Sequence, residues 1–187
     1  MSLELLHYTI TFILIFSTLY SYGLLITEKL NYNFCNEIFF KILVGYTFIG
    51  TLTVIFHFFF NVGNLFSFFL IINGLGILSY YFFKILKKEI FIFLIILIFI
   101  GPILFGYSDH PIDSNMYHHP YISYLKSEKI IFAIANIQFR FGHISFLQYA
   151  QSALSNDYFH NISIASINII FYFSFIFFIF KKIKFQE

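Results

Sequence analysis

Five long stretches of apolar residues, separated by polar breaks, dominate the pattern along the chain. Each is long enough to cross a bilayer as a helix, which takes roughly 17–25 residues. Since the hydrocarbon core offers no water to pair with backbone groups, each stretch must be helical. The pattern therefore predicts an all-α polytopic membrane protein with about five transmembrane helices, at residues 5–27, 38–60, 65–84, 90–106 and 162–180.

One long polar stretch, residues 107–161, separates the last two predicted spans. Asp113 is suited to cap a short helix over residues 114–126. The capping-box spacing of Ser145 and Gln148 predicts a second helix that ends near Leu154. Both helices should lie flat in the membrane interface. Their apolar faces would consist of Tyr117, Tyr121, Ile122 and Leu125 in the first helix and Leu147, Ala150 and Leu154 in the second.

The segment between these two helices, residues 129–141, is apolar but too short to span a bilayer comfortably. We expect it to form a partly buried or re-entrant connection. The chain then divides into two parts. Residues 1–88 carry three N-terminal transmembrane helices, and residues 89–187 carry a fourth helix, the loop 107–161 and a fifth helix.

Lysines indicate the orientation of the chain, because the cytoplasmic loops of membrane proteins are enriched in them. They gather in the link between the third and fourth spans and in the C-terminal tail, so both segments should be cytoplasmic. The N-terminus and the loop 107–161 would then lie outside. The lysines concerned are Lys84, Lys87 and Lys88 in the link and Lys181, Lys182 and Lys184 in the tail.

Composition supports a lipid bilayer as the surroundings of this chain. Hydrophobic residues make up 59% of it and charged residues only 11%, against about 25% charged in a soluble domain. The single cysteine, Cys35, excludes an intramolecular disulfide and a cysteine-based zinc module. A net charge of +2 is too small to indicate nucleic acid as a partner.

Residues able to do chemistry are concentrated in the loop 107–161. It contains all three aspartates, the single arginine and five of the seven histidines. Asp109 and Asp113 begin it, just where the fourth predicted span leaves the bilayer. A carboxylate at this boundary suits a general base that acts on a water-borne acceptor while a lipid-linked donor stays in the membrane.

Seven residues of this loop form a pattern with defined spacing. Three positions follow Asp113 before a Tyr-His pair, and further on an Asn is followed by Arg, Gly and Ser ahead of the second short helix. The residues are Asp113, Tyr117 and His118, then Asn136, Arg140, Gly142 and Ser145. The pattern resembles that of bacterial membrane glycosyltransferases of the GT-C type.

The resemblance implies transfer of a sugar from a polyprenyl-phosphate carrier to an acceptor on the outer face of the bacterial inner (plasma) membrane. It implies Asp113 as the catalytic residue and Arg140 near the donor phosphate. Asp109, Tyr117, His118 and Asn136 would complete the substrate-binding set. GT-C enzymes are usually far longer, with many spans after this loop, so the sequence is expected to correspond to the N-terminal portion of such an enzyme.

Each of these residues also has a simpler interpretation. Asp113 could serve only as a helix cap, and Arg140 could snorkel to the headgroups instead of clamping phosphate. His118 and His119 could bind acceptor or only pack at the interface. Together with His110, Asp109 and Asp113 they could hold a divalent cation, although their spacing matches no closed metal motif.

Two polar residues lie inside predicted spans, where such residues are functional candidates. His57 could simply bond a neighbouring helix, and Lys41 is near enough to a span end to snorkel. The alternative to an enzyme is a non-catalytic multi-pass membrane protein, such as an accessory or binding subunit. A small transporter ranks lower, because charged residues avoid the span interiors.

Overall fold

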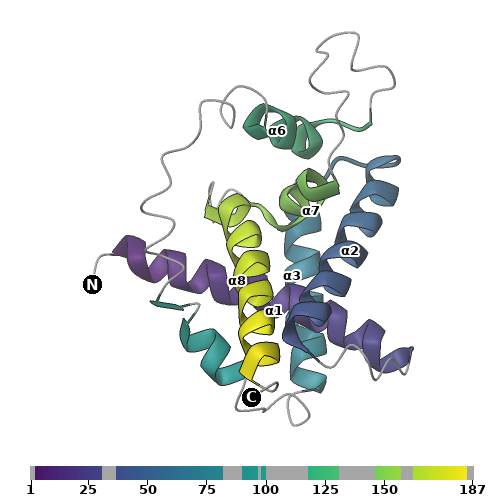
Figure 1. Ribbon diagram of the computed structural model, residues 1–187. Coiled ribbons are helices and arrows are strands. Elements are labelled where there is room, and N and C mark those ends of the chain that lie inside the picture. The colour runs from purple at the N-terminus through teal and green to yellow at the C-terminus, as the bar shows by residue number, and fades with distance from the viewer. Residues whose placement is uncertain are drawn as a thin grey trace.

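The described parts of the computed structural model, residues 3–30, 37–81, 90–96, 98–99, 118–130, 146–156 and 162–184, are helical apart from turns and short links. Figure 1 shows the arrangement. The helices with defined bounds are α1 (Leu3–Lys29), α2 (Ile38–His57), α3 (Asn64–Tyr80), α6 (His119–Ser127), α7 (Phe146–Leu154) and α8 (Ile162–Lys184). The predicted all-α class is confirmed.

Three helices in the described part of the chain are long and apolar enough to cross a membrane: α1, α2 and α8. Helix α3 is apolar but has only 17 residues. Residues 90–96 and 98–99, within the fourth predicted span, are also helical. Helix α2 ends three residues before the expected limit, because residues 58–60 form a turn that leads into the link to α3. Each of the five predicted spans thus contains a helical segment among its described residues, and three of these segments are of full spanning length.

Helix α1 lies at the centre of the bundle and packs against α2, α3 and α8. In Figure 1 it crosses the more upright α2, α3 and α8 obliquely. Its contact with α2 is so close that a Cβ atom on Gly23 would lie 1.7 Å from the Lys41 carbonyl oxygen, and one on Gly45 1.8 Å from the Leu19 carbonyl oxygen. Without a hydrophobic drive between helices in lipid, small residues of this kind allow the backbone approach that holds them together.

Phenylalanine side chains fill the remaining contacts between the helices. Phe93, in the helical segment after Ile90, lies between Phe16 of α1 and Phe177 of α8, with ring centroids 5.2 and 5.6 Å away. Phe39 of α2 contacts a row of rings on α8, at centroid distances of 5.3–5.7 Å, from Phe171, Phe175 and Phe178. Dispersion contacts between these rings connect helices that are far apart in the sequence.

The two ends of the bundle differ in chemistry. At one end, here called the lysine end (Lys29, Lys181 and Lys182), Lys181 Nζ lies 2.9 Å from a Glu37 carboxylate oxygen just before α2. At the other end, the last residue of α2 and the link that follows it are hydrogen-bonded to α6 and to the residues just after α6. The bonds run from Val62 N–H to the Leu125 carbonyl (2.9 Å), from Asn61 Nδ2 to the Ser127 carbonyl (3.3 Å), and from Ile130 N–H to the His57 carbonyl (3.3 Å).

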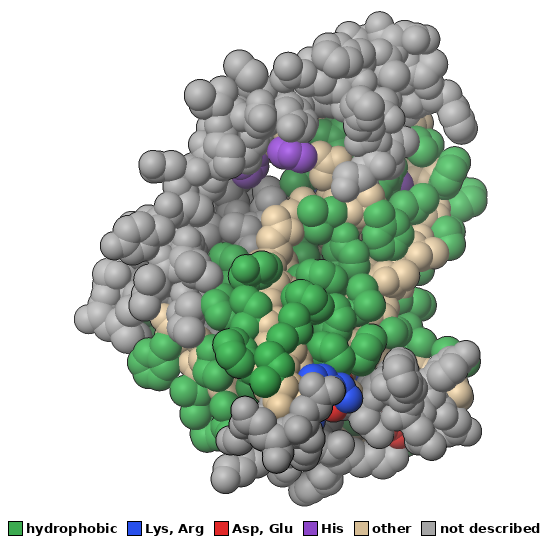
Figure 2. All heavy atoms as spheres, in the orientation of Figure 1, with side chains coloured by type: hydrophobic (Ala, Val, Ile, Leu, Met, Phe, Trp, Pro, Cys, Tyr) green, Lys and Arg blue, Asp and Glu red, His purple; other side chains and the backbone are tan. Residues whose placement is uncertain are grey.

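Helix α2 connects these two ends, and its 20 residues span about 30 Å at 1.5 Å per residue. That length equals the hydrocarbon thickness of a typical bilayer. The short link before α3 and the loop helices therefore lie at the same end, opposite the C-terminal lysines. Figure 2 shows a broad band of apolar side chains, with Lys and Glu at its lower edge and His at its upper edge.

The outer surface of the helices is strongly apolar. Large side chains with more than half of their surface exposed occur on α3 and α8, including Leu65 (87% exposed), Ile72, Phe69, Tyr172 and Phe180. So many exposed large apolar side chains are unusual for a soluble monomer. They are what a bundle in contact with hydrocarbon requires.

Both predicted short helices are present, but their surroundings differ. Helix α6 begins at His119, whereas the sequence predicted a start at residue 114; residues 114–117 and the predicted cap Asp113 lie outside the described residues. Helix α7 ends at Leu154, as predicted. Helix α6 buries one face, formed by Tyr121, Ile122 and Leu125. Helix α7 is buried at every position from Gln148 to Leu154 and packs against α2, α3, α6 and α8. The expected flat arrangement with one apolar face therefore fits α6, whereas α7 is enclosed. Its small residues Ala150, Ser152 and Ala153 let neighbours approach from all sides.

Candidate functional site

Helix α7 carries an unusual concentration of buried polar side chains for a segment enclosed by apolar helices. Gln148, Gln151 and Ser152 are at most 5% exposed, and the two residues that follow the helix, Ser155 and Asn156, are at most 4% exposed. Burial of a polar group without a hydrogen bond costs roughly 1–3 kcal/mol. Polar groups in this number therefore have to be held by one another and by neighbouring helices, which makes α7 the candidate site.

A chain of hydrogen bonds connects α2, α7 and α6 at the centre of this region. Tyr149 OH lies 3.2 Å from Nδ1 of His57, and Nε2 of His57 lies 3.0 Å from the Glu128 carbonyl oxygen. Tyr121 is hydrogen-bonded to Tyr149 from the other side. His57, Tyr149 and Tyr121 are 0%, 2% and 3% exposed. The rings of His57 and Tyr149 also meet edge to face, with centroids 5.6 Å apart.

The chemistry of the partners determines the direction of each hydrogen bond. A backbone carbonyl can only accept, so His57 must carry its proton on Nε2 and donate it to Glu128. In the neutral ring Nδ1 is then an acceptor, and Tyr149 OH donates to it. Tyr149 oxygen in turn accepts from Tyr121. The series of hydrogen bonds therefore runs from Tyr121 through Tyr149 and His57 to the backbone carbonyl of Glu128.

Burial keeps the two phenols of this chain neutral. It raises the pKa of Tyr121 well above its ordinary value, and the neighbouring Tyr149 raises it further. Burial likewise raises the pKa of Tyr149, against a smaller lowering by the hydrogen bond from Tyr121. Both groups therefore stay protonated and able to donate throughout the physiological range.

Two glutamines extend the polar contacts of α7 outward. Gln148 Nε2 donates to Nδ1 of His118 at 2.8 Å, which connects α7 to the start of α6. Gln151 Nε2 donates to Oδ1 of Asn168 on α8 at 3.3 Å. Within the described part of the chain, Gln148 Oε1 and Ser152 Oγ are buried with no hydrogen-bond partner. Buried atoms of this kind usually bind ordered water or a ligand.

His118 is the one member of the predicted site whose position the structure describes. It immediately precedes α6, in helical conformation and without a side-chain cap, and its ring is exposed at the surface while Nδ1 is held by Gln148. The catalytic candidate Asp113 and the substrate-binding candidates Asp109, Tyr117, Asn136 and Arg140 lie outside the described residues. The residues that are described contain no group of three His, Cys, Asp or Glu side chains placed to hold a metal ion.

The sequence did not indicate the importance of α7. Its polar residues resemble the solvent face of an interfacial helix, and only tertiary packing shows that this face is enclosed. His57 did give a signal, as a polar residue inside a predicted span, and the interpretation that it bonds a neighbouring helix is the one the structure shows. Lys41 is only 4% exposed, with Nζ 5.5 Å from the centre of the Tyr20 ring, instead of extending to the surface.

The fold and this polar region define the class of the protein: it is an all-α membrane protein with a buried polar layer at one end of its helix bundle. The chain belongs to the family described as Domain of unknown function (DUF8201), whose model matches residues 5–187. No curated protein and no solved structure matches it.

Proposed function

We propose that this chain, with its loop 107–161, acts in a membrane glycosyltransferase of the GT-C type. The enzyme would transfer a sugar from a polyprenyl-phosphate carrier to an acceptor at the outer face of a bacterial inner membrane. In this orientation the N-terminus lies outside and the lysine end is cytoplasmic. The observation that carries the proposal is the spaced pattern from Asp113 to Ser145 in a loop that follows an apolar span.

In the proposed reaction, Asp113 removes the proton from an acceptor hydroxyl as its oxygen attacks the anomeric carbon of the sugar. The bond from that carbon to the carrier phosphate breaks, and polyprenyl phosphate leaves with the electron pair. The guanidinium of Arg140 neutralises the phosphate oxygens in a bidentate contact. The lipid part of the donor remains in the bilayer, so the loop needs to bind only its phosphate and sugar.

The position of α6 and α7 supports this proposal. Both lie at the end of the bundle opposite the lysine end, separated from it by the length of α2. His118 follows Tyr117 in the pattern, and its ring is oriented by the buried amide of Gln148. In the proposed enzyme His118 contacts the acceptor, and Gln148 acts as a positioning residue that fixes the ring.

The test is sugar transfer from polyprenyl-phosphate-linked hexoses in membranes that contain the longest natural reading frame. Asp113→Asn should lower the rate at least about 100-fold, because it removes the general base. Asp157→Asn is the matched control, since Asp157 lies in the same loop but outside the pattern, and it should retain activity. Unchanged activity in Asp113→Asn would refute the proposed role.

A second candidate is a non-catalytic accessory or binding subunit. The series of hydrogen bonds through His57 supports it. These bonds are buried and end on a backbone carbonyl, as expected for bonds that only stabilise the fold. Such a subunit would not consume the sugar donor. The purified protein would still bind polyprenyl phosphate, and the Asp113→Asn variant would bind it as tightly as the wild type. Donor turnover by the wild type would exclude this candidate.

A further inference from the structure

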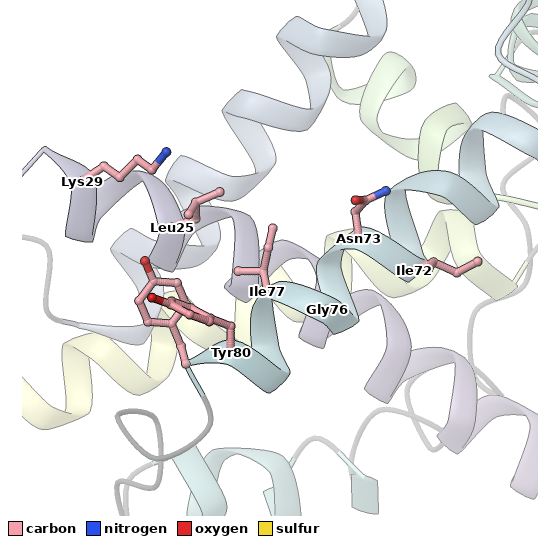
Figure 3. A pocket seen from close by; sticks show the side chains of 8 residues that line it. Leu25, Lys29, Ile72, Asn73, Gly76, Ile77 and Tyr80 are labelled. Atoms are coloured by element: carbon pink, nitrogen blue, oxygen red, sulfur yellow. The ribbon is translucent and has the colours of Figure 1, made fainter.

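A groove lies between α1 and α3 near the lysine end, far from α6 and α7. Its volume is about 600 Å³, within the range of roughly 300–1,000 Å³ typical of small-molecule sites. Leu25 and Lys29 line it from α1, and Ile72, Gly76, Ile77 and Tyr80 line it from α3. Figure 3 shows Lys29 and Tyr80 at one end of the groove and Ile72 toward the other.

Apart from Asn73, whose amide donates a hydrogen bond to the Phe69 carbonyl, the middle of this groove is apolar and open. Leu25 and Ile77 are half-buried, and Ile72 is 65% exposed on the surface that faces hydrocarbon. A Cβ atom on Gly76 would meet nothing within 4 Å, whereas one on Gly74 would lie 3.1 Å from Thr18 Cα. Gly74 therefore serves the contact between α1 and α3, and Gly76 instead keeps the floor of the groove open.

The end of the groove is polar and cationic. Lys29 is an exposed residue in the last turn of α1, and Tyr80 is 82% exposed at the end of α3. Phenols of this kind lie at the level of lipid headgroups, with the ring in the apolar region and the hydroxyl in water. Among the described residues that line the groove, none is acidic. Lys84, Lys87 and Lys88 follow in the sequence directly after this part of α3.

This geometry points to a binding site for one anionic phospholipid. An acyl chain would lie along Ile72, Gly76 and Ile77, and the headgroup phosphate would meet the Lys29 ammonium and the Tyr80 hydroxyl. A lipid fits this groove better than a peptide helix does, because the groove is open to the bilayer along its side and carries its charge only at the end. Basic pockets between transmembrane helices at the lysine-rich side are suited to anionic headgroups.

The site can be tested on the purified full-length chain by native mass spectrometry with phosphatidylglycerol and phosphatidylcholine. We expect one phosphatidylglycerol to be retained per chain in preference to phosphatidylcholine. Gly76→Leu fills the groove without a backbone clash and should abolish this retention. Ser79→Leu is the matched control: it adds the same side chain to an exposed position one turn away, and binding should persist.

A second pair of variants tests the charge. Lys29→Ala should weaken phosphatidylglycerol binding about fivefold, as expected for the loss of one lysine near an anionic headgroup. Lys182→Ala, an exposed lysine at the same end on α8, should leave binding unchanged. Inorganic phosphate should not compete, since the acyl chain supplies much of the affinity. Equal binding of both lipids, full binding to Gly76→Leu, or competition by inorganic phosphate would overturn the site. The outcome is independent of any transferase activity.

Discussion

At the scale of single residues, the hydroxyl of Tyr149 joins three helices. It donates to His57 of α2, accepts from Tyr121 of α6, and itself belongs to α7. Each partner is buried, so water cannot easily replace the hydroxyl. This atom therefore contributes more than an ordinary surface hydrogen bond, for which the net stabilisation is about 0.5–1.5 kcal/mol.

Tyr149→Phe should destabilise the protein by about 1–3 kcal/mol, because it leaves Nδ1 of buried His57 without a donor while changing the volume very little. Thermal unfolding in detergent, followed by circular dichroism, measures the effect. Tyr172→Phe removes a hydroxyl from a side chain that is 63% exposed on α8 and should not change the unfolding temperature. Equal unfolding temperatures for Tyr149→Phe and wild type would mean that the chain of bonds contributes nothing to stability.

The raised pKa values of Tyr121 and Tyr149 predict how stability depends on alkaline pH. In the unfolded chain these phenols have a pKa near 10, and in the folded chain a higher one. The folded state therefore holds its protons longer, and the stabilisation is complete below pH 10 and decreases as pH rises through the folded values. Ultraviolet titration of tyrosinate should show that Tyr149→Phe leaves the absorbance rise near pH 10 unchanged.

At the scale of elements, the contact between α1 and α2 organises the bundle. Gly23 and Gly45 bring the two backbones together at a distance that no side chain could occupy. Helix α1 is then surrounded by α2, α3 and α8, and every residue from Ile15 to Leu24 is buried.

Gly45→Ala should separate α1 from α2 and destabilise the bundle by about 1–3 kcal/mol or more, since the added methyl overlaps the Leu19 carbonyl. Gly76→Ala is the matched control, because its methyl meets nothing within 4 Å. This variant should be as stable as wild type or more stable by up to about 1 kcal/mol, the gain in helix propensity. The unfolding temperatures of both variants in detergent measure the effect. A Gly45→Ala variant as stable as the wild type would contradict the close contact between the backbones of α1 and α2.

At the scale of the whole molecule, the bundle has two chemically different ends separated by the length of α2. The lysine end contains the Lys181–Glu37 ion pair. The opposite end contains α6, α7 and the link between α2 and α3. A membrane that surrounds the apolar band between them would place the two ends on opposite sides.

Cysteine labelling can test this arrangement in cells, in a background in which Cys35 is replaced by Ala. A membrane-impermeant maleimide should label Ser123→Cys, an exposed position on α6, from outside. It should label Lys182→Cys only after the membrane is permeabilised. If both positions were labelled in intact cells, the two ends would not lie on opposite sides, and the proposed orientation would be wrong.

How much of the site the sequence could predict depends on the residue. The apolar face of α6 could be read from the spacing of Tyr121, Ile122 and Leu125, because one helix alone defines it. His57 was detectable as a polar residue in an apolar stretch. Its partner Tyr149 was not, because the two residues lie 92 positions apart and their bond depends on how α7 enters the bundle.

The sequence by itself determined the helical membrane class and the approximate positions of the described helices, because the length of an apolar stretch reflects the transfer of side chains from water to lipid. Only the tertiary structure decided whether the polar face of a helix such as α7 meets water or other helices. The local sequence pattern cannot distinguish a polar helix face in contact with water from one in contact with other helices. Water and polar side chains of neighbouring helices can both form hydrogen bonds with the residues of such a face. The burial of Gln148, Gln151 and Ser152, and the groove beside Gly76, result from packing between helices that are distant in the sequence.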